Sequence, residues 1–435
     1  MANNEFTRLG RRVIQYIIDP LQENHDPAPI WCLGRRYTSP YRDSQSSPVS
    51  SASTGNSGSD ASQADSAVVA EESTPTDKTS ADRPTPRGPS DSAQAEEEAL
   101  LGWPAEFLDD LESKIWLTYR SNFPAIPRSS HPQATAHMSL TTKLRNLGNK
   151  DGFTSDTGWG CMIRSGQSLL ANALTLLRFG RDWRLGEREE EYRELLGLFA
   201  DVPQAPFSIH RFVEHGAQAC GKHPGEWFGP SATARCIQAL APHSPTTPLR
   251  VYARPDDNNV YLDTLLATAT APDTSTFHPT LILLGTRLGI DRITPTYHAA
   301  LLAALELPHS VGIAGGRPGS SHYFVGHQGS ALFYLDPHTT RPALPAPPVD
   351  PGAARPCHTR RVRALRIADV DPSMLVGFVV RTRAELEAWR LGVEAAAAGG
   401  GKAVVQVHER EPRYASGIER AGAVDEVETW DDGGV

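Results

Sequence analysis

Hydrophobic positions divide this chain into a helix-like first half and a strand-like second half. Helical spacing or long apolar segments predict helices over 107–119, 168–177 (with Cys161 at its N-terminal end), 188–199 and 230–241. Farther along, short apolar runs predict strands over 251–253, 281–286, 311–314, 323–325, 331–335 and 374–380, interrupted by one helix over 297–307. The turn-like residues 326–330 predict a hairpin. This order of elements predicts an α+β fold with a largely antiparallel sheet.

Composition separates four regions. Residues 43–98 consist mostly of Ser, Thr, Ala, Asp, Gly and Pro, which predicts a disordered insert, because almost no large apolar side chain is available for burial. The insert separates an N-terminal segment, residues 1–42, from the main domain at 99–395. We expect the N-terminal segment to pack on that domain. A Gly-rich run and an acidic end predict a flexible acidic tail over 396–435.

Charge and cysteine content narrow the functional classes. With 42 Lys and Arg against 51 Asp and Glu, the net charge of -9 disfavours binding to nucleic acid or to anionic membranes. Five scattered cysteines indicate a reducing compartment rather than a secreted disulfide scaffold. The N-terminus lacks a signal-peptide core, and no apolar run approaches about 18 residues. We therefore expect a soluble protein inside the cell.

The segment Gly158-Trp159-Gly160-Cys161 contains a candidate nucleophile. A thiol at the start of a buried helix gains partial positive charge, which lowers its pKa and favours the reactive thiolate. The glycines allow a sharp turn and close approach of a substrate, and free N–H groups at a helix start stabilise an oxyanion. A buried structural cysteine is the alternative for any single cysteine.

The segment Asp336-Pro337-His338 supplies a candidate base for Cys161. Side chains two residues apart at the end of a strand project to the same side, so Asp336 is placed to orient His338. His338 would then accept the thiol proton, and Asp336 would stabilise the charged ring. Taken alone, such a tripeptide is more often a turn with a surface histidine. The combination with Cys161 favours catalysis.

A metal site is the competing interpretation of this region. Five residues close in sequence offer ligands: His322, His327, Asp336, His338 and His358. None has a recognised spacing such as HExxH, so we predict neither a metal nor a cofactor. Cys220 and Cys236 lack CxxC partners and are expected to be core thiols.

Several motifs resemble one family, the autophagins, which are autophagy-related cysteine peptidases. The matching blocks, in the family's order, are 31–37, 116–126, 156–164, 226–230, 315–318 and 335–340. The resemblance extends over residues 30–42 and about 100–395.

The resemblance implies a papain-like cysteine peptidase that acts in autophagy and protein transport. It would cleave after the C-terminal glycine of a ubiquitin-like autophagy modifier, both to mature the precursor and to release the modifier from phosphatidylethanolamine. The expected partners are the free precursor and the lipid conjugate, with peripheral membrane contact through the conjugate and no nucleic acid. A monomer is expected, in the cytoplasm, with the nucleus and the pre-autophagosomal structure as further locations.

The resemblance also implies residue roles beyond the nucleophile Cys161, the base His338 and its orienter Asp336. Tyr119 would be an oxyanion donor beside the Cys161 backbone N–H, although alone it reads as the end of a core helix. Trp227 would form a gate with a loop, narrowing the cleft to a slot that admits glycine. Ordinary core packing is the alternative for Trp227. The loop consists of Arg317, Pro318, Gly319 and Ser320.

Two further features concern partners and alternative functions. Phe6 and Leu9 fit a short aromatic-x-x-aliphatic motif that binds the modifier as an added strand, whereas the segment at Trp430 has Gly433 where an aliphatic belongs. The alternatives to a peptidase are a transglutaminase, which would join an amine to glutamine, and an adaptor that retained the fold without activity.

Overall fold

The computed structural model describes residues 22–41, 101–131, 134, 138–139, 142–143, 151–243, 249–271, 273, 275–316, 320–398 and 401–412. Several predictions lie outside these residues. They are the modifier-binding motif at Phe6 and Leu9, the insert at 43–98, the gate residues Arg317, Pro318 and Gly319, and the segment at Trp430.

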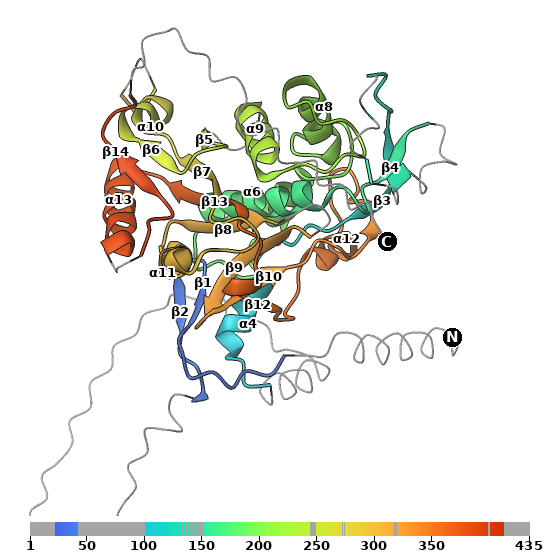
Figure 1. Ribbon diagram of the computed structural model, residues 1–435. Helices are drawn as coiled ribbons and strands as arrows, with labels where there is room; N and C mark the ends of the chain where they lie inside the picture. Colours follow the sequence, from blue (N-terminus) through green and yellow to red (C-terminus); the bar gives the residue numbers. More distant parts are fainter. Residues whose placement is uncertain are drawn as a thin grey trace, which may run out of the picture.

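The main sheet of the described chain has the strand order β12–β10–β9–β8–β13–β7–β5, and β1 joins β9 while pairing with β2 (Figure 1). Its pairings are antiparallel apart from β5 with β7, which confirms the predicted largely antiparallel sheet. The strands are β1 (Ile30–Cys32), β2 (Arg35–Tyr37), β5 (Arg250–Arg254), β7 (Thr280–Arg287), β8 (Ser310–Gly315), β9 (His322–Gln328), β10 (Ala331–Leu335), β12 (Ala364–Arg366) and β13 (Ser373–Val380).

Two smaller sheets lie beside it. One has the order β11–β3–β4, and in the other β14 pairs with β6. Their strands are β3 (Arg120–Ile126), β4 (Phe153–Ser155), β6 (Asn259–Tyr261), β11 (Arg341–Pro342) and β14 (Gln406–His408).

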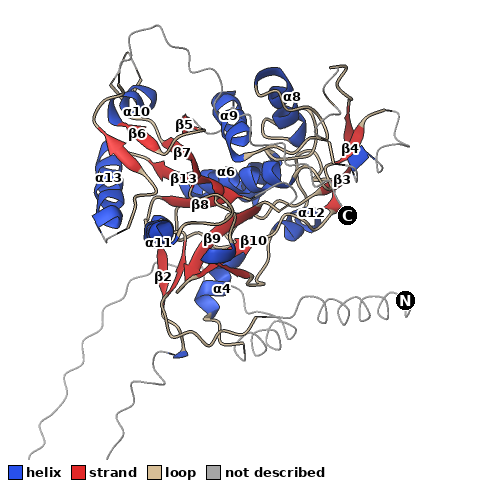
Figure 2. Ribbon diagram, viewed as in Figure 1, coloured by secondary structure: helices blue, strands red, loops and turns tan. Residues whose placement is uncertain are grey.

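Helices cover both faces of the main sheet (Figure 2). They are α4 (Ala105–Glu112), α6 (Cys161–Phe179), α7 (Glu189–Gly197), α8 (Ile209–Ala219), α9 (Pro230–Leu240), α10 (Leu262–Ala269), α11 (His298–Glu306), α12 (Pro351–Ala354) and α13 (Arg383–Ala398). In the described part of the chain, no helix combines the length and the apolar character that crossing a membrane requires.

Neighbouring residues of β13 show how α6 and α13 are placed. A Cβ on Gly377 would lie 3.1 Å from a methyl group of Leu169 in α6, so this strand position accommodates the helix because it lacks a side chain. The next residue, Phe378, packs against Trp389 of α13 with ring centroids 5.6 Å apart. Because successive strand residues face opposite sides of a sheet, α6 and α13 cover opposite faces.

The predicted helix over 107–119 is wrong beyond α4. Ser113 ends the helix, and residues 115–119 belong to neither a helix nor a strand. The N–H groups of this segment find partners elsewhere: Ile115 donates to Asn172 Oδ1, Trp116 to the carbonyl of Cys357, Leu117 to Ser168 Oγ, and Tyr119 to the carbonyl of Pro337. Side chains of α6 thus replace the helical acceptors, and Tyr119 leads directly into β3.

Elsewhere the structure contains the predicted elements together with helices and strands that were not predicted. All six predicted strands and the helices matching α6, α7, α9 and α11 are confirmed, whereas α8, α10, α12 and α13 were not predicted. Residues 396–412, assigned to the flexible tail, instead include the end of α13 and the paired strand β14 where the structure describes them.

Candidate active site

A tight turn places Cys161 as the first residue of α6. The N–H groups of Trp159 and Gly160 donate to the Asp156 carbonyl at 3.1 and 2.8 Å. A Cβ on Gly160 would lie 2.4 Å from Asp156 Oδ2, closer than any side chain tolerates. The turn therefore requires glycine immediately before Cys161.

A buried ion-pair network anchors this turn. Arg164 Nε donates to Asp156 Oδ2 at 2.7 Å, and Arg164 Nη1 donates to Asp201 Oδ1 at 2.8 Å. The other carboxylate oxygens accept backbone N–H groups, from Arg120 to Asp156 and from Leu344 to Asp201. All three charged side chains are buried, so each relies on its partners in place of water.

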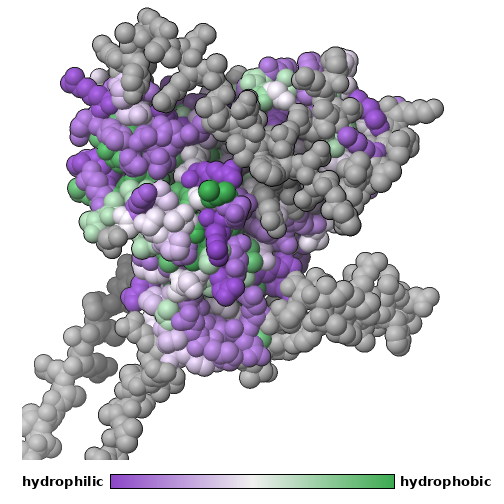
Figure 3. Space-filling view, in the orientation of Figure 1, coloured by the Kyte–Doolittle hydropathy of each residue, from purple (hydrophilic) through white to green (hydrophobic). Residues whose placement is uncertain are grey.

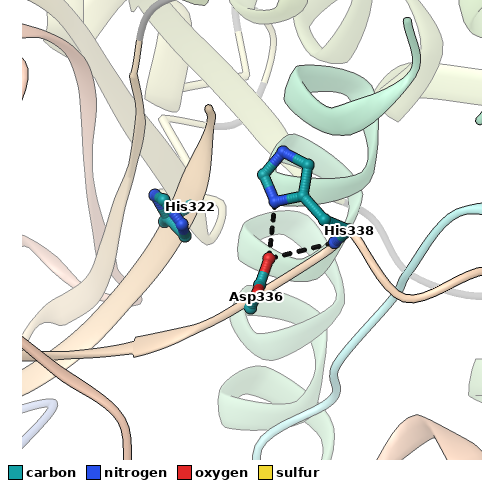
Figure 4. A group of neighbouring side chains, drawn as sticks. All are labelled: His322, Asp336 and His338. Carbon is teal, nitrogen blue, oxygen red and sulfur yellow. Dashed lines mark hydrogen bonds and ion pairs between the residues drawn. The ribbon is translucent and has the colours of Figure 1, made fainter. Parts of the chain in front are cut away.

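Asp336 and His338 follow the end of β10 and face each other as predicted (Figure 4). Nδ1 of His338 lies 2.5 Å from Asp336 Oδ1, and the His338 backbone N–H donates to the same oxygen at 3.0 Å. Segment 116–119 holds this loop from the other side, since Trp116 Nε1 donates to the Asp336 carbonyl at 2.7 Å and Tyr119 N–H donates to the Pro337 carbonyl at 2.8 Å.

Three groups surround the Cys161 thiol, which is fully buried. Tyr119 Oη and His338 Nε2 are both buried, and neither makes a hydrogen bond of normal geometry within the described chain. Both nevertheless lie close enough to Cys161 to shift its pKa, and the Ser321 backbone N–H lies near enough to lower the pKa of the same thiol. The rings of Tyr119 and His338 meet edge to face, with centroids 5.5 Å apart.

These neighbours determine the protonation states. Burial opposes charge on Cys161, but the His338 ring, the Ser321 N–H and the Tyr119 hydroxyl outweigh it and lower the pKa of the thiol. Burial also opposes charge on His338, yet Asp336 and Cys161 raise the pKa of the imidazole to about 9. The pKa of Asp336 falls to about 2 despite burial, because His338 donates to it. These contacts thus favour the thiolate of Cys161 and the imidazolium of His338.

His322, at the start of β9, also borders this site (Figure 4). Its ring lies 5.5 Å from that of His338 and 4.6 Å from that of Tyr334, measured between centroids. Burial lowers the pKa of His322 to about 4, so the imidazole is neutral at physiological pH. Nitrogen and oxygen atoms of His322, Asp336 and His338 all lie within 4.8 Å of one another.

The other residues of the candidate metal set are engaged elsewhere. His327 lies 3.1 Å from a carboxylate oxygen of Glu306. His358 is hydrogen-bonded to the hydroxyl of Tyr192 and to the carbonyl of Glu112. The two thiols expected in the core are free, with Cys236 buried and Cys220 partly buried.

The gate residues are only partly described. Trp227 is half-buried just before α9, and its indole N–H is buried without a hydrogen-bond partner in the described chain. Ser320 adjoins Ser321, whose N–H contacts Cys161, so at least this end of the predicted gate loop lies near the thiol. The part of Trp227 in substrate binding stays a prediction.

Sequence reasoning did not identify four residues that shape the site. Asp156 and Arg164 belong to the motif around Cys161, but their ion pair was not predicted. Ser321 acts through its backbone, which leaves no signal in the identity of the side chain. His322 was considered only as a metal ligand. The predicted hairpin nevertheless implies that it lies opposite Asp336, the residue that follows β10.

Comparison with known proteins agrees with this geometry. Residues 104–391 match the family described as Peptidase C54 catalytic domain. The chain is 52% identical over 437 residues to a probable cysteine protease atg4 of Sclerotinia sclerotiorum, covering 97% of this chain and 96% of the relative. It is 52% identical to the protein of the same name from Botryotinia fuckeliana, covering 98% and 97% of the two chains.

A third relative, the cysteine protease ATG4 of Pyricularia oryzae, is 45% identical over 98% of this chain and 96% of its own length. The match to the family spans more than half of the chain, and these relatives align with nearly all of it. The chain therefore belongs to the peptidase C54 family of cysteine proteases, the autophagin family that its motifs resemble.

Proposed function

We propose that this cysteine peptidase cleaves after the C-terminal glycine of a ubiquitin-like autophagy modifier, with Cys161 as nucleophile, His338 as base and Asp336 as its orienter. The observation that carries the proposal is the His338 ring, which bonds Asp336 through Nδ1 and directs Nε2 into the buried space next to Cys161. A nucleophile, a base and an orienting carboxylate in this order suffice for acyl transfer.

The first chemical step would form a thioester. The Cys161 thiolate attacks the glycine carbonyl carbon, and the carbonyl oxygen becomes an oxyanion. As the first residue of α6, Cys161 has a backbone N–H without an acceptor inside the helix, which makes it one oxyanion donor. Tyr119 Oη is the second proposed donor. His338 then gives its Nε2 proton to the departing amine as the C–N bond breaks.

The second step would release the modifier. His338, now neutral, takes a proton from water, and the hydroxyl attacks the thioester. The C–S bond breaks, the glycine leaves as a free carboxylate, and the Cys161 thiolate and the charged His338 are restored. Asp336 stabilises the imidazolium in both steps and fixes the tautomer through Nδ1.

Selectivity for glycine is attributed to the gate formed by Trp227 and the loop Arg317, Pro318, Gly319 and Ser320. Complete burial of Cys161 supports a narrow approach, because a substrate must displace covering atoms to reach the sulfur. A slot of this kind admits a residue without a side chain and excludes larger ones.

The same chemistry would serve two substrates. In the precursor, the amide nitrogen after glycine belongs to the next amino acid, and in the lipid conjugate it belongs to phosphatidylethanolamine. Both leaving groups are amines, so one thiolate, one imidazolium and one oxyanion site act on either. The proposed place of action is the cytoplasm, where contact with a membrane would come through the conjugate.

The test is cleavage of a purified modifier that carries extra residues after its glycine, followed by mass measurement of the product. We expect a product that ends in glycine, no product with Cys161→Ala, and no joining of added amines to glutamine. A cut at another bond would contradict the proposal. So would unchanged cleavage by Cys161→Ala.

A further inference from the structure

The hairpin of β9 and β10 brings three metal-binding side chains together at its open end. In the antiparallel register Leu335 pairs with Tyr323, so the next residues outward, Asp336 and His322, adjoin each other. His338 folds back over Asp336. The ligand atoms of His322, Asp336 and His338 consequently lie within 4.8 Å of one another (Figure 4).

The donor set selects the kind of ion. Two imidazole nitrogens and one carboxylate oxygen suit Zn²⁺, whereas Mg²⁺ and Ca²⁺ prefer oxygen ligands alone. In a tetrahedral zinc site with bonds of about 2.0–2.1 Å, neighbouring ligand atoms lie about 3.3 Å apart, so small side-chain rotations would close this group around an ion. Three protein ligands leave a fourth position for water.

The group is also accessible. The side chains of Asp336 and His338 are each 25% exposed, which gives an ion a route from solvent. The Cys161 sulfur does not belong to this group of mutually close ligand atoms, although it neighbours His338. On the face shown in Figure 3, hydrophilic and hydrophobic side chains of the described residues are interspersed.

We infer that His322, Asp336 and His338 form a reversible Zn²⁺ site whose occupancy inhibits the peptidase. A zinc ion at His338 Nδ1 would replace the proton that this nitrogen shares with Asp336. The carboxylate would then bind the ion instead of orienting the ring, and His338 would lose the partner that stabilises its charged form. Inhibition thus rests on the proposed function, whereas zinc binding does not.

Binding is tested without substrate, by calorimetric titration of ZnCl₂ into the full-length Cys161→Ala protein. We expect one equivalent of Zn²⁺ to bind, and binding at least about tenfold weaker when His322→Asn is added. His327→Asn is the matched control, because it removes the other histidine of β9, which pairs with Glu306 instead. This control should leave binding unchanged.

Thermal unfolding checks that the variants are folded. Zn²⁺ should raise the Tm of Cys161→Ala and leave that of the variant with His322→Asn unchanged, while their metal-free Tm values stay close. Loss of binding in Cys161→Ala would show that the thiolate is the ligand and would overturn the inference. Equally tight binding after His322→Asn would also overturn it.

Activity is tested by inhibition, expressed relative to the metal-free rate of each protein. ZnCl₂ should inhibit the protein with its natural Cys161 at concentrations where MgCl₂ and CaCl₂ do not, and His322→Asn should raise the half-inhibitory concentration at least about tenfold. If the peptidase is active and ZnCl₂ inhibits it equally with and without His322, that result would contradict the zinc site alone. A protein that binds zinc but cleaves no modifier would contradict the proposed function alone.

Discussion

Nδ1 of His338 lies 2.5 Å from a carboxylate oxygen of Asp336, and the same oxygen also accepts the His338 backbone N–H. The carboxylate therefore fixes both the position of the loop and the orientation of the ring. It leaves Nε2 to face Cys161. This division of the two ring nitrogens makes the protonation of His338 depend on Asp336, which a pH profile measures.

Activity should require the charged form of His338 and the thiolate of Cys161. Because the pKa of His338 is raised to about 9, the imidazolium is present below that pH and is lost as pH rises through it, so kcat/KM should fall above about pH 9. With Asp336→Asn the pKa of His338 should return toward about 6.5, which moves this alkaline limb to lower pH.

At pH 7.5 the Asp336→Asn variant should lose about 100-fold in kcat/KM, within the range for general acid–base groups. The measurement is kcat/KM for an extended modifier between pH 5 and pH 10. An alkaline limb that stays in place after Asp336→Asn would show that the carboxylate does not set the charge of the ring.

Tyr119→Phe tests the proposed oxyanion donor. The hydroxyl makes no hydrogen bond of normal geometry with a described residue, so its removal should leave stability unchanged while kcat falls about 100-fold and KM changes little. Tyr252→Phe is the control, because its hydroxyl accepts the Tyr261 N–H on another strand and should affect stability rather than kcat. A higher KM with unchanged kcat in Tyr119→Phe would argue against oxyanion stabilisation by this hydroxyl.

Asp156→Ala tests the buried network under the turn. Among the described residues it leaves the Arg164 guanidinium with Asp201 as its only carboxylate partner, which should cost about 3–5 kcal/mol of unfolding free energy. Asp182→Ala removes the exposed partner of Arg35 and should change stability by less than about 0.5 kcal/mol. Urea denaturation compares the two. A loss below about 1 kcal/mol for Asp156→Ala would mean that Arg164 finds other partners.

Trp227→Ala tests the proposed glycine gate. For the unaltered peptidase, kcat/KM should be at least about 100-fold higher for the modifier with its C-terminal glycine than for one with alanine in its place. In Trp227→Ala this ratio of kcat/KM values should fall below about tenfold. The comparison of kcat/KM for the two modifiers gives the result. Trp31→Ala, which removes another partly buried indole, should leave the ratio unaltered. An unaltered ratio in Trp227→Ala would remove Trp227 from the gate.

The sequence predicted those parts of the fold that local pattern controls. The six strands of the second half and the buried helix α6 carry continuous apolar runs, and each formed where expected. The extension of a helix to Tyr119 failed because apolar spacing continues past Ser113, while the backbone is held by Ser168 and Asn172 of α6, some 50 residues away. Local periodicity carries no information about such distant partners.

The candidate site shows the same contrast. Cys161, Asp336 and His338 stood out because short motifs place each at the end of a helix or strand, and the structure brings them together. The pairing of Arg164 with Asp201 spans 37 positions and was invisible to motif analysis. Ser321 contributes a backbone N–H, which any residue other than proline supplies.

The central claim is that Cys161 is the nucleophile that attacks the terminal glycine. A modifier whose C-terminal carboxylate is replaced by a thiol-reactive group should form a covalent adduct, and tandem mass spectrometry of the digested adduct identifies the labelled cysteine. We predict labelling at Cys161 and no adduct with Cys161→Ala. Labelling at Cys32, Cys220, Cys236 or Cys357, or an adduct that persists in Cys161→Ala, would contradict it.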